Sequence, residues 1–133
     1  MGTIFTKIIK GKIPCYKVFE DENHLAFLDI APLTKGHTLV IPKKAIDYIF
    51  DINSEEYKNL WILAKKVARG MDIALEVERI SIMVVGLEVP HAHIHLIPIN
   101  KMEDINFQRE RITFSKSEME EIAGVISSSI LSS

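Results

Sequence analysis

The sequence predicts an α+β fold, a mainly antiparallel sheet of about five strands with a long central helix and a C-terminal helix. Short β-prone runs separated by turn residues predict the sheet. Two longer stretches with apolar residues at helical spacing predict the helices. Because the 133 residues contain no internal repeat, low-complexity tract or linker, we expect one domain over residues 1–133.

The first half of the chain predicts a short helix followed by three strands. Apolar residues lie at near-helical spacing from Ile4 to Lys10, and Gly11 then ends the helix. Two β-prone runs with turn residues between them predict a hairpin, and a third run ends before a proline. These three strands are expected at Tyr16–Glu20, His24–Asp29 and Thr38–Ile41.

The second half predicts two helices with two strands between them. Asn53 and Glu56 have the spacing of a capping box at the start of the long helix, and Ser117 with Glu120 repeats this spacing near the C-terminus. Residues 101–114 are polar and predict a loop. The apolar faces are expected to be Leu60, Ala64, Val67, Ala68, Met71 and Leu75 in the first helix, and Ile122, Val125, Ile126 and Ile130 in the second. The two strands are expected at Ile80–Gly86 and His91–Ile97.

Composition excludes several classes of function. Sixteen basic residues against 18 acidic ones leave a net charge of −2, which argues against nucleic-acid binding. The single cysteine, Cys15, excludes an internal disulfide and a four-cysteine zinc site. No apolar run approaches the roughly 18 residues of a membrane span, and no signal peptide is evident, so we expect a cytoplasmic protein without membrane association.

Three of the five histidines lie at alternate positions, His91, His93 and His95. Side chains alternate between the two faces of a strand, so these three imidazoles should share one face. The intervening apolar residues should enter the core from the other face; these are Ala92, Ile94 and Leu96. The pattern therefore predicts a reactive face and a packed face on one segment.

Three interpretations of the histidines remain open on the residues alone. They can be the polar face of an exposed edge strand. They can bind a metal, since imidazoles are good zinc ligands, although no H-E-x-x-H motif is present. They can also serve nucleophilic catalysis, in which one neutral imidazole attacks phosphorus and its neighbours donate hydrogen bonds.

The segment HAHIHLI resembles the motif of the histidine triad (HIT) family. The resemblance extends upstream through IFTKIIKGKIP, HLAFLDIAP and GHTLVIPKK in the same order, and it covers most of residues 3–99. It implies a nucleotide-binding homodimer that acts at the α-phosphorus of a purine nucleotide. His93 then corresponds to the nucleophile that becomes nucleotidylated, His91 and His95 to its flanking partners, and His37 to a supporting histidine on a neighbouring strand.

The resemblance also implies how the nucleoside is bound. Asp29 corresponds to the acidic residue that accepts hydrogen bonds from the ribose hydroxyls. The apolar walls around the purine correspond to Phe5, Ile8, Phe27 and Ile30.

The chain departs from the family pattern near the phosphate. Leu87 stands where a glutamine normally contacts the phosphate chain, and leucine cannot donate a hydrogen bond. Glu88 should lie near the leaving group, where a carboxylate repels polyphosphate but accepts hydrogen bonds from an amine or hydroxyl. Arg109 and Arg111 are considered as phosphate contacts from the loop.

Positions that hold structural zinc in many bacterial relatives carry poor ligands here, namely Thr3, Thr6 and Ala45. We therefore expect no metal and no cofactor. The sequence predicts a phosphoramidase-like purine nucleotide hydrolase or nucleotidyl transferase that releases a nucleoside monophosphate such as AMP. A dinucleoside polyphosphate hydrolase, a nucleotide-binding module with weak catalysis and a metal-dependent hydrolase are the alternatives.

Overall fold

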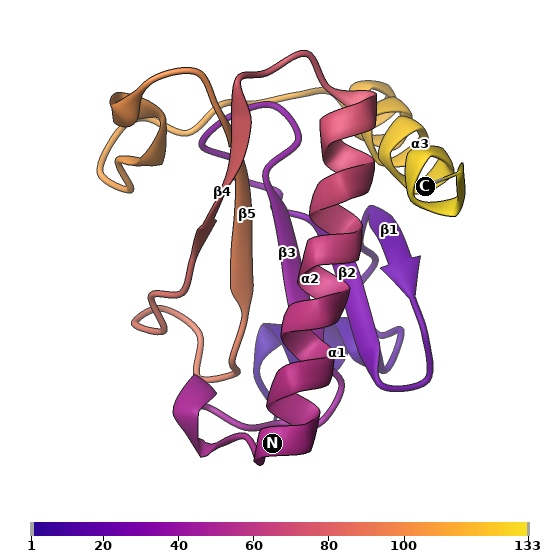
Figure 1. The fold of residues 1–133 in the computed structure, drawn as a ribbon, viewed down its shortest axis with the longest axis vertical. Helices are drawn as coiled ribbons and strands as arrows, with labels where there is room; N and C mark the ends of the chain where they lie inside the picture. The colour runs from indigo at the N-terminus through magenta and orange to yellow at the C-terminus, as the bar shows by residue number, and fades with distance from the viewer. Residues whose placement is uncertain (1, 133) are drawn as a thin grey trace.

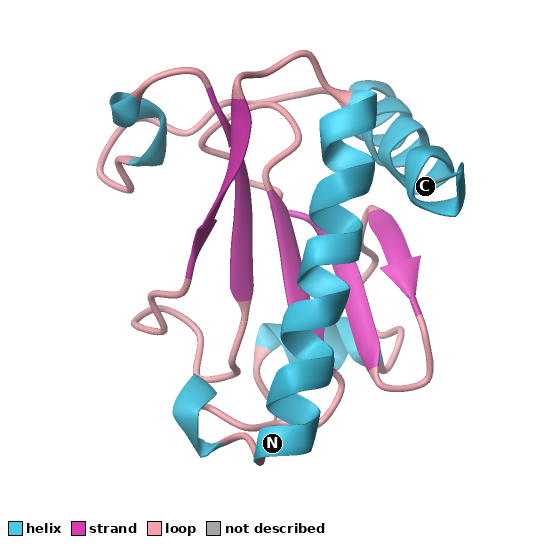
Figure 2. Ribbon diagram, in the orientation of Figure 1, coloured by secondary structure: helices cyan, strands magenta, loops and turns pink. Residues whose placement is uncertain are grey.

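A computed structural model describes residues 2–132, whose five strands form one antiparallel sheet in the order β1-β2-β3-β5-β4 (Figure 1). The strands and helices are coloured by type in Figure 2. The strands are β1 (Lys17–Glu20), β2 (His24–Leu28), β3 (Thr38–Pro42), β4 (Arg79–Met83) and β5 (Ile94–Ile99). The helices are α1 (Ile4–Ile9), α2 (Ser54–Ala74) and α3 (Lys116–Ser132), with short 3-10 turns η1 (Ile49–Asp51) and η2 (Met102–Ile105). The predicted fold class is confirmed.

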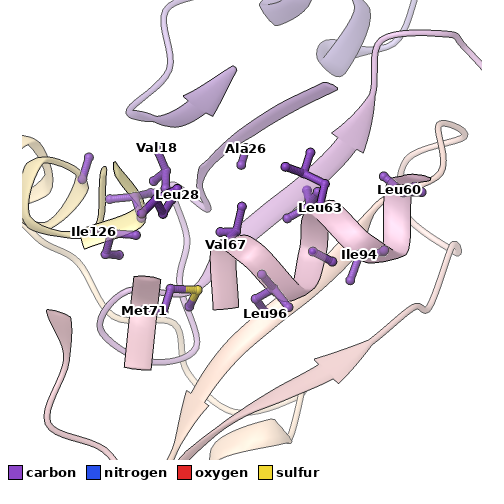
Figure 3. Close-up of a cluster of buried hydrophobic side chains, with 14 of the residues drawn as sticks. Val18, Ala26, Leu28, Leu60, Leu63, Val67, Met71, Ile94, Leu96 and Ile126 are labelled. Carbon is purple, nitrogen blue, oxygen red and sulfur yellow. The ribbon is translucent and has the colours of Figure 1, made fainter. Parts of the chain in front are cut away.

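Helices α2 and α3 cover one face of the sheet and enclose the larger hydrophobic core (Figures 1 and 3). The apolar stripe of α2 predicted from the sequence supplies much of this core, because Leu60, Ala64, Val67 and Met71 are all buried. The strands add side chains at alternate positions, including Val40, Ile94 and Leu96, and Ala92 just before β5 continues this alternation.

The short helix α1 lies on the opposite face of the sheet, behind it in Figure 1. A second, smaller cluster of buried side chains forms there, and it consists of Phe5, Leu25, Phe27, Leu39 and Ile41. Residues of β2 and β3 therefore contribute to different cores at successive positions. This second face is the one that carries the predicted functional residues.

The histidine segment begins before the strand that was predicted to contain it. β5 starts at Ile94 rather than His91, because the backbone N–H groups of His91 and Ala92 donate to Val89 and Ile46 instead of to a neighbouring strand. β4 likewise ends at Met83 rather than Gly86. His91 and His93 thus lie in an irregular segment leading into β5.

The helix boundaries correct one prediction and confirm two. The side chain of Asn53 caps α2 at the backbone N–H of Glu56, as expected, and Gly11 follows α1 with a positive φ of 76°. The predicted cap of α3 is wrong by two residues: Ser115 and Glu118 cap each other reciprocally, so α3 starts earlier than Ser117 and Glu120 indicated.

The predicted apolar face of α3 is confirmed at three of its four positions. Ile122, Ile126 and Ile130 are buried, whereas Val125 is 44% exposed because it faces away from the sheet and α2. Within residues 2–132, no helix is both long enough and apolar enough to cross a membrane.

Candidate active site

The alternation of side chains along three adjacent strands gathers the candidate residues on the α1 face. Asp29 follows Phe27 of β2 by two positions, and His37 precedes Leu39 of β3 by two. His95 of β5 pairs directly with Leu39 across the sheet. Residues two apart on a strand share a face, so a carboxylate and the histidines meet beside the α1 cluster.

The hydrogen bonding of His93 leaves one ring nitrogen free to act as a nucleophile. Its Nδ1 lies 2.7 Å from the backbone carbonyl oxygen of His91. A carbonyl oxygen only accepts hydrogen bonds, so Nδ1 carries the proton and donates. In the neutral ring the lone pair is therefore on Nε2, on the other side of the imidazole.

A chain of hydrogen bonds determines the tautomers of His37 and His95. The backbone N–H of Leu33 donates to His37 Nδ1 at 3.0 Å, so the proton of His37 is on Nε2. That Nε2 donates to His95 Nδ1 at 2.9 Å. His95 therefore carries its own proton on Nε2, which points away from His37 as a remaining donor.

The buried setting keeps these rings neutral. Burial, followed by the nearby charge of His95 and of Arg111, lowers the pKa of His37 to about 3. Burial also lowers the pKa of His95 to about 3, with smaller contributions from His93 and Arg111. A neutral His37 is what the hydrogen bond from Leu33 requires, because a protonated ring could not accept there.

His91 is fully buried and fills a structural position behind His93. Its Nε2 donates to the carbonyl oxygen of Pro42 at 2.8 Å, and its ring lies edge-on to Phe5 with centroids 5.8 Å apart. Within the described residues, its Nδ1 has no hydrogen-bond partner. Burial lowers the pKa of His91. This ring thus joins the β3 end to the α1 helix.

A cavity of about 430 Å³ opens on this face, which we call the triad cavity, and its size is typical of a site for a small ligand. Eight of the ten residues predicted from the sequence line it, and they are Phe5, Ile8, Phe27, Asp29, Ile30, Glu88, His93 and His95. His37 and His91 do not line it and lie behind its wall. Ile30 is 71% exposed, so it forms part of the rim rather than a buried wall.

Asp29 lies in the triad cavity with one oxygen engaged and one available. Its Oδ1 accepts the backbone N–H of Ala31 at 2.9 Å. Its Oδ2 lies 3.7 Å from His37 Nε2 and 3.9 Å from Arg111 Nη1. Burial raises the pKa of Asp29; the Ala31 hydrogen bond and Arg111 oppose the rise, and Glu88 adds to it.

Two residues of the 102–114 segment enter the site: Phe107, which the sequence analysis did not identify, and Arg111, which it considered only as a phosphate contact from a polar loop. Phe107 packs edge-on against His95 with ring centroids 5.0 Å apart. Arg111 lines the triad cavity next to Asp29, whereas Arg109 pairs with Asp104 at 2.9 Å. Neither residue belongs to a periodic pattern, so only a basic residue near a predicted carboxylate could have indicated Arg111.

Leu87 and Glu88 are adjacent but face different spaces. Glu88 lines the triad cavity. Leu87 is 88% exposed and lines a second cavity of about 620 Å³, the β4 cavity, which also includes Ile82 and Trp61. His93 borders both cavities. Leucine at position 87 therefore contributes an apolar surface beside the site rather than a contact in the triad cavity.

The hydrogen bonds of His37 to Leu33 and to His95 oppose metal binding at these rings. Ligand atoms of Asp29, His37 and His95 lie within 4.8 Å of one another, which is close enough to surround an ion. A metal on His37 Nε2 would move its proton to Nδ1, where it would face the backbone N–H of Leu33. The expected absence of a metal stays a prediction, and these donors suit a hydrogen-bonded chain better than an ion.

Comparison with known proteins agrees with this geometry. The family model of the HIT domain matches residues 10–102. Protein hit of Bacillus subtilis is 45% identical over 102 residues, covering 71% of this chain and 69% of that protein. Adenosine 5′-monophosphoramidase of Schizosaccharomyces pombe is 40% identical over 103 residues, covering 74% of each chain.

Solved structures agree on the fold as well as the motif. The crystal structure of a Hit-like protein from Bartonella henselae has a TM-score of 0.83 and 31% identity, covering 96% of this chain and 95% of that one. The histidine motif, the five-stranded sheet and these relatives together place the chain in the histidine triad family.

Proposed function

We propose that this protein is a phosphoramidase-like hydrolase that cleaves purine nucleotide derivatives at the α-phosphorus. The observation that carries the proposal is the Nε2 of His93 at the edge of the triad cavity, which holds the lone pair of the neutral ring because Nδ1 donates to the His91 carbonyl. The chain belongs to a family whose fission yeast relative is named an adenosine 5′-monophosphoramidase, which supports a phosphoramidate substrate.

The proposed first step is attack by His93 Nε2 on the α-phosphorus. A bond forms between Nε2 and phosphorus, and the P–N bond to the amine breaks. The amine leaves with the electron pair of that bond and takes a proton from solvent. In the second step a water oxygen attacks phosphorus, the bond to Nε2 breaks, and the water releases a proton. The sum is phosphoramidate plus water giving nucleoside monophosphate plus amine.

His95 stabilises charge on the phosphoryl oxygens in this proposal. Its proton is on Nε2 and its pKa is lowered to about 3, so the ring is a neutral hydrogen-bond donor rather than a strong acid. His37 holds this tautomer through its own bond to His95. The pair is therefore preorganised before substrate enters.

Glu88 favours a small amine over a polyphosphate as the leaving group. Its carboxylate lines the triad cavity and repels further negative charge, as its opposing effect on Asp29 already indicates. An amine can instead donate a hydrogen bond to it. We therefore propose adenosine 5′-phosphoramidate as the test substrate, with Asp29 accepting the ribose hydroxyls and Phe5, Ile8, Phe27 and Ile30 surrounding the purine.

We also propose that the chain acts as a homodimer that uses the β4 edge. β4 is one of the two edge strands of the sheet, and exposed apolar side chains surround it. An unpaired strand edge with such neighbours is a typical subunit interface. These side chains are Tyr48, Phe50, Ile82, Val85 and Leu87. Sedimentation equilibrium should give twice the chain mass, and Ile82→Lys should reduce it.

Mass spectrometry of acid-quenched enzyme tests the mechanism directly. During turnover of adenosine 5′-phosphoramidate, we expect a nucleotidyl adduct on the peptide that contains His93. A dinucleoside polyphosphate offered at equal concentration should be cleaved more slowly. AMP binding by calorimetry without any turnover would contradict the enzyme and favour a binding module instead. Activity abolished by a chelator would contradict the metal-free mechanism.

A further inference from the structure

The segment between η2 and α3 reaches the triad cavity at Arg111, next to Asp29. The backbone N–H of Ile112 donates to the carbonyl oxygen of Pro32 at 3.0 Å, and Arg111 Nη1 donates to the carbonyl oxygen of Ala31 at 2.6 Å. Both bonds tie this segment to the turn that follows Asp29. The guanidinium is thereby held in one place, 80 residues away in sequence from its partner.

Arg111 lies near the available oxygen of Asp29 without occupying it. The distance from Nη1 to Oδ2 is 3.9 Å, which is too long for a hydrogen bond and short enough for charge attraction. Since Oδ1 already accepts from Ala31, Oδ2 keeps its lone pairs for a ligand. A cation in this position favours the ionised carboxylate and leaves its acceptor capacity free.

An aromatic ring supports the guanidinium from behind. Phe107 lies under Arg111, with the guanidinium carbon 5.5 Å from the ring centroid. The same ring packs on His95 and on His37, with centroids 5.0 Å and 6.4 Å away. Phe107 therefore links the position of Arg111 to the histidines of the site.

We propose that Arg111 is a positioning residue that holds Asp29 ready for the two ribose hydroxyls and so makes the site select ribonucleotides over 2′-deoxyribonucleotides. This inference rests on the proposed function, because it requires the nucleoside to lie in the triad cavity. It adds a residue from outside the 10–102 segment that matches the family model. Phe5, Ile8 and Phe27 contribute shape and apolar contact to the same cavity.

The charges around Asp29 explain why Arg111 has this effect. The groups that face the carboxylate are His37, Glu88, His93 and Arg111. Glu88 opposes ionisation, and His37 is neutral. Arg111 is the permanently charged cation among the described residues that line the triad cavity. Without it, Asp29 would bind a proton more readily and lose strength as an acceptor.

Steady-state kinetics with adenosine 5′-phosphoramidate and its 2′-deoxy analogue test this proposal. Removing the charge with Arg111→Gln should reduce the ratio of kcat/KM for the two substrates by about two- to tenfold, where tenfold is the full difference between a charged and a neutral acceptor. The change should lie in KM, with kcat nearly unchanged. Arg111→Lys should restore part of the ratio, since it keeps the charge. The acid limb of the kcat/KM profile should move to higher pH in Arg111→Gln.

Arg109→Gln is the matched control, because Arg109 lies in the same segment but pairs with Asp104. It should leave the ratio unchanged. In an Asp29→Asn background, Arg111→Gln should have no further effect on the ratio. Equal ratios in wild type and Arg111→Gln, with both enzymes active, would overturn the role of Arg111 alone. A wild-type protein that cleaves neither substrate would instead overturn the proposed function.

Discussion

The segment from His91 to Leu96 presents two faces that are buried to nearly the same degree but differ in chemistry. Ile94 and Leu96 are fully buried against α2, while His93 and His95 are 5% and 6% exposed on the other side. On the first face, burial is stabilised by apolar contact. On the second, polar rings tolerate burial because a backbone carbonyl or a neighbouring ring satisfies one nitrogen of each ring. Burial alone therefore does not distinguish core from site; the hydrogen-bond partners do.

The largest effect should come from the polar face. His93→Ala removes the proposed nucleophile, so kcat/KM for adenosine 5′-phosphoramidate should fall at least about 10³-fold. The control is His24→Ala, since His24 lies in the β1–β2 hairpin and bonds to Asp21. Retained turnover in His93→Ala would show that the polar face of the segment does not supply the nucleophile.

The apolar face should respond in stability rather than in chemistry. Ile94→Ala leaves a cavity under α2 and should lower the free energy of unfolding by about 2–5 kcal/mol, measured by urea titration. Ile73→Ala, at a position 62% exposed on α2, should change it by less than about 0.5 kcal/mol. The folded fraction of Ile94→Ala should keep its kcat. A large fall in kcat of Ile94→Ala with an unchanged free energy of unfolding would show that the apolar face acts in catalysis and not in stability.

The neutral histidines should make stability depend on pH. In the unfolded chain a histidine binds a proton below about pH 6.5, whereas His37 and His95 stay neutral down to about 3. The two rings therefore do not reduce the free energy of unfolding above about pH 6.5. As the pH falls below that value, each ring lowers the free energy of unfolding by about 1.4 kcal/mol per pH unit.

Urea titrations at pH 7, 6 and 5 measure this dependence. His37→Gln should make the unfolding free energy depend less steeply on pH, by the amount that corresponds to about one proton. If the slopes of the variant and the wild type were equal, His37 would titrate normally in the folded protein, and the tautomer chain to His95 would be wrong.

The smallest effects should separate two glycines in the helices that cover the apolar face. A Cβ at Gly70 would lie 2.4 Å from Ile130 Cγ1, and close to the backbone of α3 as well, whereas a Cβ at Gly124 meets nothing within 4 Å. Gly70→Ala should destabilise the protein by about 1–3 kcal/mol. Gly124→Ala should stabilise it by about 0.5–1 kcal/mol through helix propensity. Equal responses to urea would mean that α2 and α3 are not in close contact.

Local patterns in the sequence were sufficient for most of the fold. Helical spacing located α2 and its buried stripe, and β-prone runs located the five strands to within a few residues. The errors lie at boundaries, where one serine competes with another as the cap of α3, and where the backbone of His91 finds partners outside the sheet. Such choices depend on hydrogen bonds that periodicity does not encode.

Only part of the candidate site could be predicted from patterns in the sequence. Alternation alone placed the three histidines on one face, but Asp29 and His37 were identified only through the resemblance to a family. Phe107 belongs to no pattern, and Arg111 was only considered as a phosphate contact, together with Arg109; the structure places its guanidinium beside Asp29. Their positions follow from bonds between the 102–114 segment and the turn after β2.

The order of residues by itself determined which side chains of the His91–Leu96 segment face the core and which face away, because the extended backbone alternates its side chains. Nδ1 of His93 donates to the carbonyl oxygen of His91 within the segment itself, but only the tertiary structure decided which nitrogen of His91 and of His95 carries a proton. That choice depends on the carbonyl oxygen of Pro42, the N–H of Leu33 and the ring of His37, which lie far from the segment in sequence. A histidine can exist as either neutral tautomer at little cost, so its partners in space determine its chemistry.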